Sequence, residues 1–152
     1  NVGAVSRAVA DADLVIGAVL VPGGRAPVVV TDEMIRTMKP GAVIVDTAID
    51  QGGCVEAIHE TSHADPVYEK HGVLHYAVGN IPAAVPNTST YGLTNVTLPY
   101  AVALATKGVA AACAADPDLA KGVNTIDGAV TNAVVADALG RESVDLATVL
   151  AG

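Results

Sequence analysis

Two apolar segments, ADLVIGAVL at residues 12–20 and AVIVD at residues 42–46, limit the fold of this chain most strongly. Continuous apolar runs of this length, bounded by polar or turn residues, are typical of strands buried on both faces of a parallel sheet. The 21 residues between Leu20 and Ala42 are long enough for a right-handed crossover and too long for a tight hairpin. The pattern therefore predicts a β-α-β unit.

The connection between these strands carries the signals of a short helix. Thr31 is placed to cap it, the acidic residues 32–33 suit its first turn, and Pro40-Gly41 ends it. A third apolar run, VLHYAV at residues 73–78, follows PVYEKHG at residues 66–72, where Lys70-His71-Gly72 can turn a short edge strand back on it. We therefore expect an α/β fold, with part of a doubly wound parallel sheet.

The pattern changes to helical after Pro86. Apolar residues recur at helical spacing as far as Lys107-Gly108, with a kink expected at Pro99. The segment VAAACAA beyond Gly108 predicts another helix, Asp116-Pro117 is typical of a helix start, and residues 127–139 give a final helix prediction. The sequence therefore predicts two parts, residues 1–86 with the sheet and residues 87–152 with helices.

Composition excludes several classes of protein. With 51% hydrophobic residues the chain can build a core, which excludes a disordered tail. Sixteen acidic residues against eight basic ones give a net charge of −8 and no basic cluster, which argues against a nucleic-acid partner. Purely apolar runs stop short of the roughly 20 residues that span a bilayer, and no signal-peptide pattern opens the chain. We expect a cytoplasmic protein without a membrane partner.

Chemistry in such a sheet is expected beyond the carboxyl ends of the parallel strands. Asp50 directly follows the second strand, beside a Gly-Gly pair that lets backbone approach a ligand closely, and Asn80 follows the third. Both residues should therefore lie on one rim. Asp50 is a candidate general acid or base, and the alternative is a turn-forming Asp bonded to its own loop. Asn80 offers an amide that can both donate and accept, or is simply a turn residue.

The remaining candidate sites are weaker. His59 and His63 have metal-ligand spacing, but the polar loop around Pro66 disfavours a helix there, so we expect no metal. Cys54, far from Cys113 and without a CxxC motif, is more typical of a small core thiol than of a nucleophile. Gly23-Gly24-Arg25 can approach a phosphate or form a turn. The chain has neither GxGxxG nor a P-loop, so any dinucleotide cradle lies outside it.

Three blocks of sequence resemble a known family. DADLVIGAVLVPGGRAP, MKPGAVIVDTAIDQGG and VGNIPAAVPNTSTYGLTNVTLPY are similar to the alanine dehydrogenase/pyridine nucleotide transhydrogenase family, and the AIDQGG and NTSTYGLTN strings favour its dehydrogenase branch. The resemblance covers nearly the whole chain and implies the second half of a Rossmann-type NAD-binding domain. The helices after it are implied to pack on a substrate domain and on neighbouring subunits of a homo-hexamer.

The resemblance also implies roles for residues on the rim. Asp50 corresponds to a catalytic residue near the nicotinamide ribose that acts in proton transfer. Cofactor contacts are implied for Val19, Leu20, Thr47, Ala48, Ile49, Asp50, Val78, Gly79, Asn80 and Ile81. Two departures are visible: the family often has Ala-Asn-Met at residues 79–81, and Lys107 stands where some members carry a metal-binding His.

The expected function is reversible, NAD-dependent oxidative deamination of L-alanine to pyruvate and ammonia. The phosphate-binding glycine loop and the substrate domain, which in this family supplies an Arg, a Lys and a catalytic His, are missing from these residues. We therefore expect a fragment, inactive alone. The alternatives are the NAD-binding subunit of a proton-translocating transhydrogenase and a non-catalytic assembly fragment.

Overall fold

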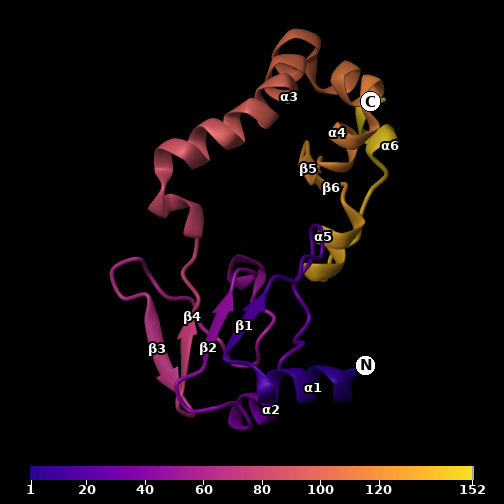
Figure 1. The fold of residues 1–152 in the computed structure, drawn as a ribbon. Coiled ribbons are helices and arrows are strands. Elements are labelled where there is room, and N and C mark those ends of the chain that lie inside the picture. The colour runs from indigo at the N-terminus through magenta and orange to yellow at the C-terminus, as the bar shows by residue number, and fades with distance from the viewer. Residues whose placement is uncertain (152) are drawn as a thin grey trace. The chain divides into compact units, whose positions relative to one another are not determined.

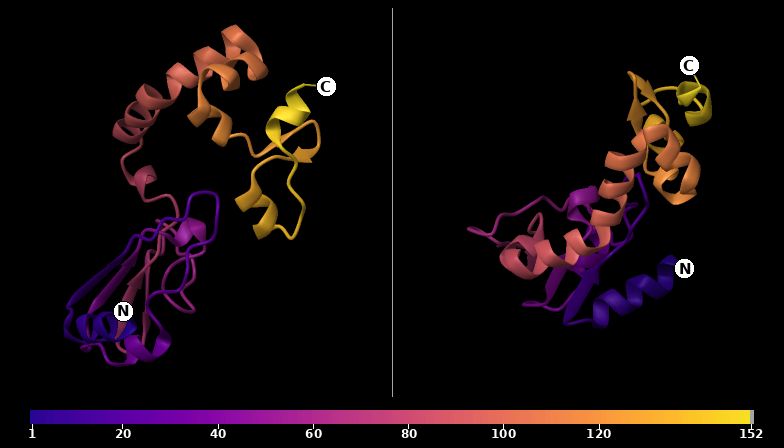
Figure 2. Two further views of the ribbon diagram at one scale, coloured as in Figure 1. Left: turned by 90° about the vertical axis from the view of Figure 1, so that its right-hand side faces the viewer. Right: turned by 90° about the horizontal axis from the view of Figure 1, so that it is seen from above.

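The computed structural model describes residues 1–151, which form two compact units, Asn1–Ala84 and the part from Val85 onward (Figures 1 and 2). The first unit holds a four-stranded sheet. Its strands are β1 (Leu14–Gly17), β2 (Val43–Asp46), β3 (Val67–Lys70) and β4 (Val73–Tyr76). Their order is β1-β2-β4-β3, with β1, β2 and β4 parallel and β3 antiparallel to β4.

The connection between β1 and β2 contains the predicted helix, α2 (Asp32–Arg36), so the β-α-β unit is confirmed. The Thr31 side chain caps α2 by accepting a hydrogen bond from the Met34 N–H. The edge hairpin is also confirmed: His71 and Gly72, both at positive φ (55° and 75°), join β3 to β4. Two positive φ angles in succession match the right-handed twist of the strands.

The core of this unit lies on one face of the sheet. Helix α1 (Val2–Asp11) contacts α2, and buried side chains such as Val9, Met34 and Ile35 join Ile44 and Val73 of the strands in one apolar cluster. Each fully buried aliphatic side chain contributes about 1.5–3 kcal/mol to folding. This face therefore holds the carboxyl ends of β1, β2 and β4 in a fixed arrangement.

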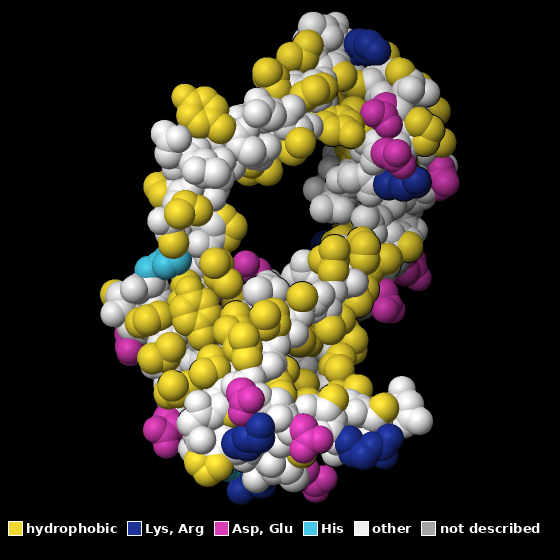
Figure 3. Space-filling model, viewed as in Figure 1, with side chains coloured by type: hydrophobic (Ala, Val, Ile, Leu, Met, Phe, Trp, Pro, Cys, Tyr) yellow, Lys and Arg dark blue, Asp and Glu magenta, His cyan; other side chains and the backbone are white. Residues whose placement is uncertain are grey.

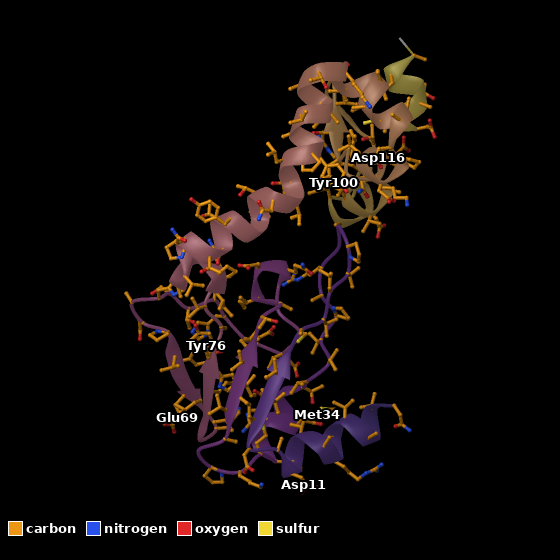
Figure 4. The ribbon with its side chains drawn as sticks, turned by 45° about the horizontal axis from the view of Figure 1, so that its top comes forward. Asp11, Met34, Glu69, Tyr76, Tyr100 and Asp116 are labelled. Atoms are coloured by element: carbon orange, nitrogen blue, oxygen red, sulfur yellow. The ribbon has the colours of Figure 1, made fainter. Side chains whose placement is uncertain are left out.

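The opposite face of the sheet is apolar and open. Leu14 and Ile16 are 54% and 63% exposed, so the prediction that the first strand is buried on both faces is wrong, and the strand is also shorter than predicted. The reason is that β1 is an edge strand here, with helices on one side only. Hydrophobic side chains gather over this face (Figure 3), and Tyr76 is labelled in Figure 4. The strand register places on this face one acid, Glu69, and the apolar residues Leu14, Ile16, Val43, Val45, Val67, Leu74 and Tyr76.

His75 makes the stability of this unit depend on pH. Its ring is 1% exposed, donates from Nδ1 to the Val73 carbonyl oxygen (3.0 Å) and stacks on Tyr68. Burial lowers the pKa of His75 below its ordinary value of 6.5, and the positive charge of Lys70 and the nearby His59 and His71 act in the same direction. The fold therefore favours the neutral ring.

Because the folded-state pKa lies below the unfolded one, this contribution is complete above pH 6.5 and is lost as the pH falls below it. Between pH 7.5 and 5.5 the wild type should lose stability, and we expect His75→Leu to lose less. The loss is measured as reduced protection of the β4 amides against hydrogen exchange. His59→Leu is the control, since that exposed ring lies on the other side of Tyr68. An unchanged pH dependence in His75→Leu would contradict the assignment.

The second unit is mostly helical. It contains α3 (Pro86–Ala115), α4 (Pro117–Lys121), α5 (Ala133–Ala138) and α6 (Leu146–Leu150). The predicted break at Gly108 is confirmed, because that residue is non-helical (φ 76°, ψ 166°) inside α3. The predicted start of α4 is also confirmed, since the Asp116 side chain accepts hydrogen bonds from the Asp118 and Leu119 N–H groups.

The predicted helix over residues 127–139 is wrong in its first half. Residues 125–130 form a hairpin of β5 (Thr125–Ile126) and β6 (Ala129–Val130), and only α5 is helical. Asp127 and Gly128 both have positive φ (49° and 80°), the geometry for which Asp-Gly is a strong hairpin signal. The preference of Asp127-Gly128 for a hairpin turn therefore overrides the helical spacing of the apolar residues around it.

Helix α3 exposes much of its apolar surface, with Tyr91, Leu93, Val96 and Leu98 each at least 60% exposed. By length and composition it is the one helix among the described residues that could cross a membrane, although the sequence contains no long purely apolar run. The same criterion is met by a core helix of a soluble protein. The exposed apolar side chains of α3 therefore form a surface on which other apolar groups can pack.

Candidate functional site

The loops that follow β1, β2 and β4 meet at one rim of the sheet, as predicted from the parallel strand order. Thr47 joins the first two loops, because both its N–H and its hydroxyl donate to the Gly17 carbonyl oxygen (2.8 Å each). Two hollows lie beside it. A smaller one of about 110 Å³ contains Val19, Leu20 and Ala48. A larger one of about 370 Å³ is lined by Thr47, Asp50, Val78, Ile81 and Pro82.

The loop after β2 turns tightly because of its glycines. Residues Ile49–Gln51 form one short 3₁₀ turn, and Gly52 and Gly53 follow with φ of 93° and 75°. A β-carbon on Gly53 would lie 2.6 Å from Ile58 Cγ2, so only glycine fits there. The glycine pair thus lets the chain double back and leaves Asp50 exposed at the tip of the loop.

Asp50 and Asn80 lie together, although 30 residues separate them in the sequence. Asp50 Oδ2 accepts a hydrogen bond of 3.4 Å from the Asn80 N–H. Asn80 has a left-handed backbone (φ 54°), and its carbonyl oxygen accepts from His63 Nε2 at 3.2 Å. The hydrogen-bond partner of the Asp50 carboxylate thus lies in another loop, and the proton-transfer role of Asp50 stays a prediction.

A second carboxylate approaches the same loop. A β-carbon on Gly79 would collide with Glu60 Oε1 and lie 3.3 Å from Asp50 Oδ1, so the Glu60 and Asp50 carboxylates flank this glycine. Thr61, next to Glu60, is hydrogen-bonded to the start of the third loop. Its N–H donates to the Ala77 carbonyl oxygen (2.9 Å), and its carbonyl oxygen accepts from the Gly79 N–H (3.4 Å). The segment from Glu60 to His63 therefore supports the third loop, a function that the sequence analysis did not predict.

Asp46 is the last residue of β2 and stands at the base of the loop that carries Asp50. It is 0% exposed, and its carboxylate accepts from the Ala48 N–H (2.9 Å) and the Cys54 N–H (2.8 Å). The local capping considered for Asp50 is therefore performed by Asp46. The sequence did contain a signal for this role, because Asp46 ends the apolar run AVIVD, and a buried acid needs hydrogen-bond partners.

Cys54 is a buried thiol, as its sequence context predicted. It is 1% exposed, and burial, followed by the negative charge of Asp46, raises the pKa of the thiol. The Sγ atom lies 3.7 Å from Asp46 Oδ1. A protonated, inaccessible thiol does not act as a nucleophile.

The four histidines do not share a common site, although His59 and His75 stack on the same ring, that of Tyr68. His59 stacks on Tyr68 with ring centroids 3.9 Å apart, His63 binds the Asn80 carbonyl oxygen, His71 lies 3.0 Å from Asp32, and His75 is buried. Within residues 1–151 no group of three or more His, Cys, Asp or Glu side chains is placed to hold a metal. Residues 59–63 are not helical, so the spacing of His59 and His63 does not place them on one helix face.

Of the two interpretations of Gly23-Gly24-Arg25, the structure shows the turn. Gly23 has φ 72°, and the Gly24 N–H donates to the Val21 carbonyl oxygen (3.0 Å). Arg25 crosses the next loop, since a β-carbon on Gly52 would lie 2.6 Å from its Nε. The turn therefore brings a basic side chain over the loop that carries Asp50.

Known proteins match this chain over most of its length. The family described as "Alanine dehydrogenase/PNT, C-terminal domain" matches residues 1–133. The alanine dehydrogenase of Bacillus subtilis is 58% identical over 141 residues, which cover 92% of this chain and 37% of that protein. The alanine dehydrogenase of Methanococcus maripaludis is 56% identical over 135 residues, covering 88% and 36% respectively. The chain thus spans less than two fifths of these two relatives.

Solved structures of both branches of the family resemble this chain. A structure of L-alanine dehydrogenase superposes with a TM-score of 0.75 at 50% identity, covering 92% of this chain and 38% of that one. A transhydrogenase from Sinorhizobium meliloti superposes with a TM-score of 0.54 at 33% identity, covering 60% and 26%. The likeness is therefore stronger on the dehydrogenase side in both identity and coverage.

Proposed function

The chain belongs to the alanine dehydrogenase/PNT family, and from this we propose that the protein carrying it catalyses NAD-dependent, reversible oxidative deamination of L-alanine to pyruvate and ammonia. The observation that carries the proposal is the rim, where Asp50 bonds the Asn80 backbone beside an apolar hollow. The chain contributes this part of the enzyme, an oxidoreductase, to a longer polypeptide.

The residues present fit one end of a dinucleotide. The larger hollow combines the apolar Val78, Ile81 and Pro82 with one acid, a composition that suits a nicotinamide ring and its ribose. The smaller hollow is lined by Gln51, whose buried side-chain oxygen Oε1 has no partner among the described residues. No glycine-rich phosphate loop is present in the sequence, so the remaining contacts to the cofactor belong to another part of the enzyme.

When bound, NAD would accept or return the hydride of the substrate. The residues of this chain would position it and manage protons. Val19, Leu20, Thr47, Ala48, Ile49, Val78, Gly79, Asn80 and Ile81 would contact the cofactor. Asp50 would hold or transfer a proton while the substrate imine forms or is hydrolysed. The apolar side chains of Val78, Ile81 and Pro82 would keep water from the reacting face.

The open edge and face of the sheet support a division into domains. Residues 1–86 would form the second half of a Rossmann-type domain, with β1 pairing to a first half and the exposed Leu14 and Ile16 covered by it. Residues 87–152 would pack through α3 on a substrate domain and on neighbouring subunits of a homo-hexamer. We propose a cytoplasmic location, without a metal and without nucleic-acid or membrane partners, with the exposed side of α3 covered by protein.

The test is NADH oxidation by the intact protein with pyruvate and ammonium, followed by absorbance at the NADH band. We expect activity that requires both substrates, and no activity from the isolated 152 residues. Absence of deamination combined with hydride exchange between nucleotides would favour the transhydrogenase alternative. Failure to bind NAD at all would favour an assembly fragment without chemistry.

A further inference from the structure

The buried carboxylate of Asp46 closes the loop that carries Asp50. Its two oxygens accept from amides at opposite ends of that loop, Ala48 N–H at 2.9 Å and Cys54 N–H at 2.8 Å. Hydrogen bonds from amide donors to an ionised carboxylate are shorter and stronger than those between neutral groups. One side chain thus fixes where the loop leaves β2 and where it returns.

The loop is also held at its start and in its middle. The Thr47 N–H and hydroxyl donate to the Gly17 carbonyl oxygen of β1 (2.8 Å each), and the Gln51 carbonyl oxygen accepts from the Ala26 N–H (3.0 Å). The hydrogen bonds within the loop are short-range, from the Gln51 and Gly53 N–H groups to the Ala48 carbonyl oxygen (2.9 and 3.0 Å). Among the described residues, none of these bonds joins the returning end of the loop to β2, which the Asp46 carboxylate does through the Cys54 N–H. The contact of Asp50 with Asn80, at 3.4 Å, is too long to hold the loop by itself.

The surroundings of Asp46 are closely packed. A β-carbon on Gly17 would lie 3.3 Å from its Oδ1 and 2.5 Å from the Cys54 sulfur, and one on Gly53 would lie 3.2 Å from its Oδ2. Glycines at both positions therefore allow β1 and the returning loop to close on the carboxylate. This packing leaves the carboxylate a single position from which to bond both amides.

We propose that Asp46 is a positioning residue, which holds the loop of residues 47–54 so that the Asp50 carboxylate meets the Asn80 backbone at the rim. The proposal rests on the function proposed above, because it gives Asp46 its effect on turnover through Asp50. A displacement of about 1 Å in a reacting group can lower a rate about a hundredfold, so the angle of this loop matters for catalysis.

The test is a double-mutant cycle in the intact enzyme at saturating NAD. Asp46→Asn keeps the shape of the side chain but replaces one acceptor oxygen with a donor that faces an amide donor. We expect kcat for L-alanine to fall about 10- to 100-fold, and by no more than about 3-fold when the same change is made in an Asp50→Asn background. Similar losses in both backgrounds would overturn the proposal, because a purely structural role does not depend on Asp50.

Two control variants separate positioning from general destabilisation. Ile44→Val removes one methylene from a fully buried residue of the same strand, two positions before Asp46, and should lower the thermal midpoint without changing kcat. Cys54→Ala removes the thiol 3.7 Å from the carboxylate but keeps both backbone donors, and should change kcat less than 3-fold. A loss in Cys54→Ala as large as in Asp46→Asn would contradict the carboxylate as the closing group.

Asp46→Ser serves if Asp46→Asn does not fold. The serine hydroxyl can turn its proton away from both amides but is too short to bond the two ends of the loop at once, so we expect a loss of kcat with the same dependence on Asp50. Wild-type enzyme without alanine deamination would refute the proposed function, whereas active wild type with additive losses would refute the positioning role alone.

Discussion

Asp50→Asn in the intact enzyme is expected to lower kcat for L-alanine about 100-fold or more, while NAD affinity changes less than about 3-fold. The substitution keeps the size of the side chain and an oxygen that can accept from the Asn80 N–H, but the amide cannot take up or release the proton. Turnover is therefore affected far more than binding. Steady-state kinetics and fluorescence titration of the nucleotide measure the two quantities separately.

The control for this variant is Asp65→Asn, which removes an exposed carboxylate two residues beyond the segment Glu60–His63 that supports the third loop. Asp65→Asn changes the net charge by the same amount as Asp50→Asn. It should leave kcat within about 2-fold, since solvent screens an exposed surface charge. If Asp50→Asn retained wild-type turnover, Asp50 would have no part in the mechanism, and the rim would serve cofactor binding alone.

Gly53→Ala is expected to destabilise the sheet-containing unit by about 3 kcal/mol. Two penalties combine. The residue has φ 75°, where a β-carbon costs about 1–2 kcal/mol, and its β-carbon would lie 2.6 Å from Ile58 Cγ2, an overpacking that costs about 1–3 kcal/mol. The loop that carries Asp50 should shift, so kcat should fall as well.

Gly41→Ala isolates the first of these penalties. Gly41 has a similar φ of 83°, but nothing lies within 4 Å of the position its β-carbon would take. We expect a loss of only about 1–2 kcal/mol and no change in kcat. Chemical denaturation and amide exchange of residues 48–54 compare the two variants, and equal losses would show that the contact with Ile58 is easily relieved.

Several parts of the structure follow from local sequence. Apolar runs and their separation predicted β2, β4 and the parallel crossover, and Thr31 and Asp116 predicted the starts of α2 and α4. These signals act over a few residues, through backbone preference and hydrogen bonds to adjacent amides. The position of Asp50 directly after a buried strand also followed, because parallel strands place their ends on one edge.

Other features depended on neighbours in space. The burial of β1 on both faces was predicted from its apolar run, yet Ile16 is exposed because burial depends on what packs over the strand. The first half of the helix predicted at residues 127–139 is a hairpin, since the left-handed preference of Asp127-Gly128 overrides apolar spacing.

The sequence by itself determined the strands of the four-stranded sheet, their direction, and that Asp50 and Asn80 share a rim. Only the tertiary structure decided that Asp46 closes the Asp50 loop and that His63 and Glu60 approach the Asn80 loop. The physical reason is range. Strand formation depends on side-chain periodicity within each segment, whereas a carboxylate or imidazole acquires its partner only when folding brings together residues distant in the chain.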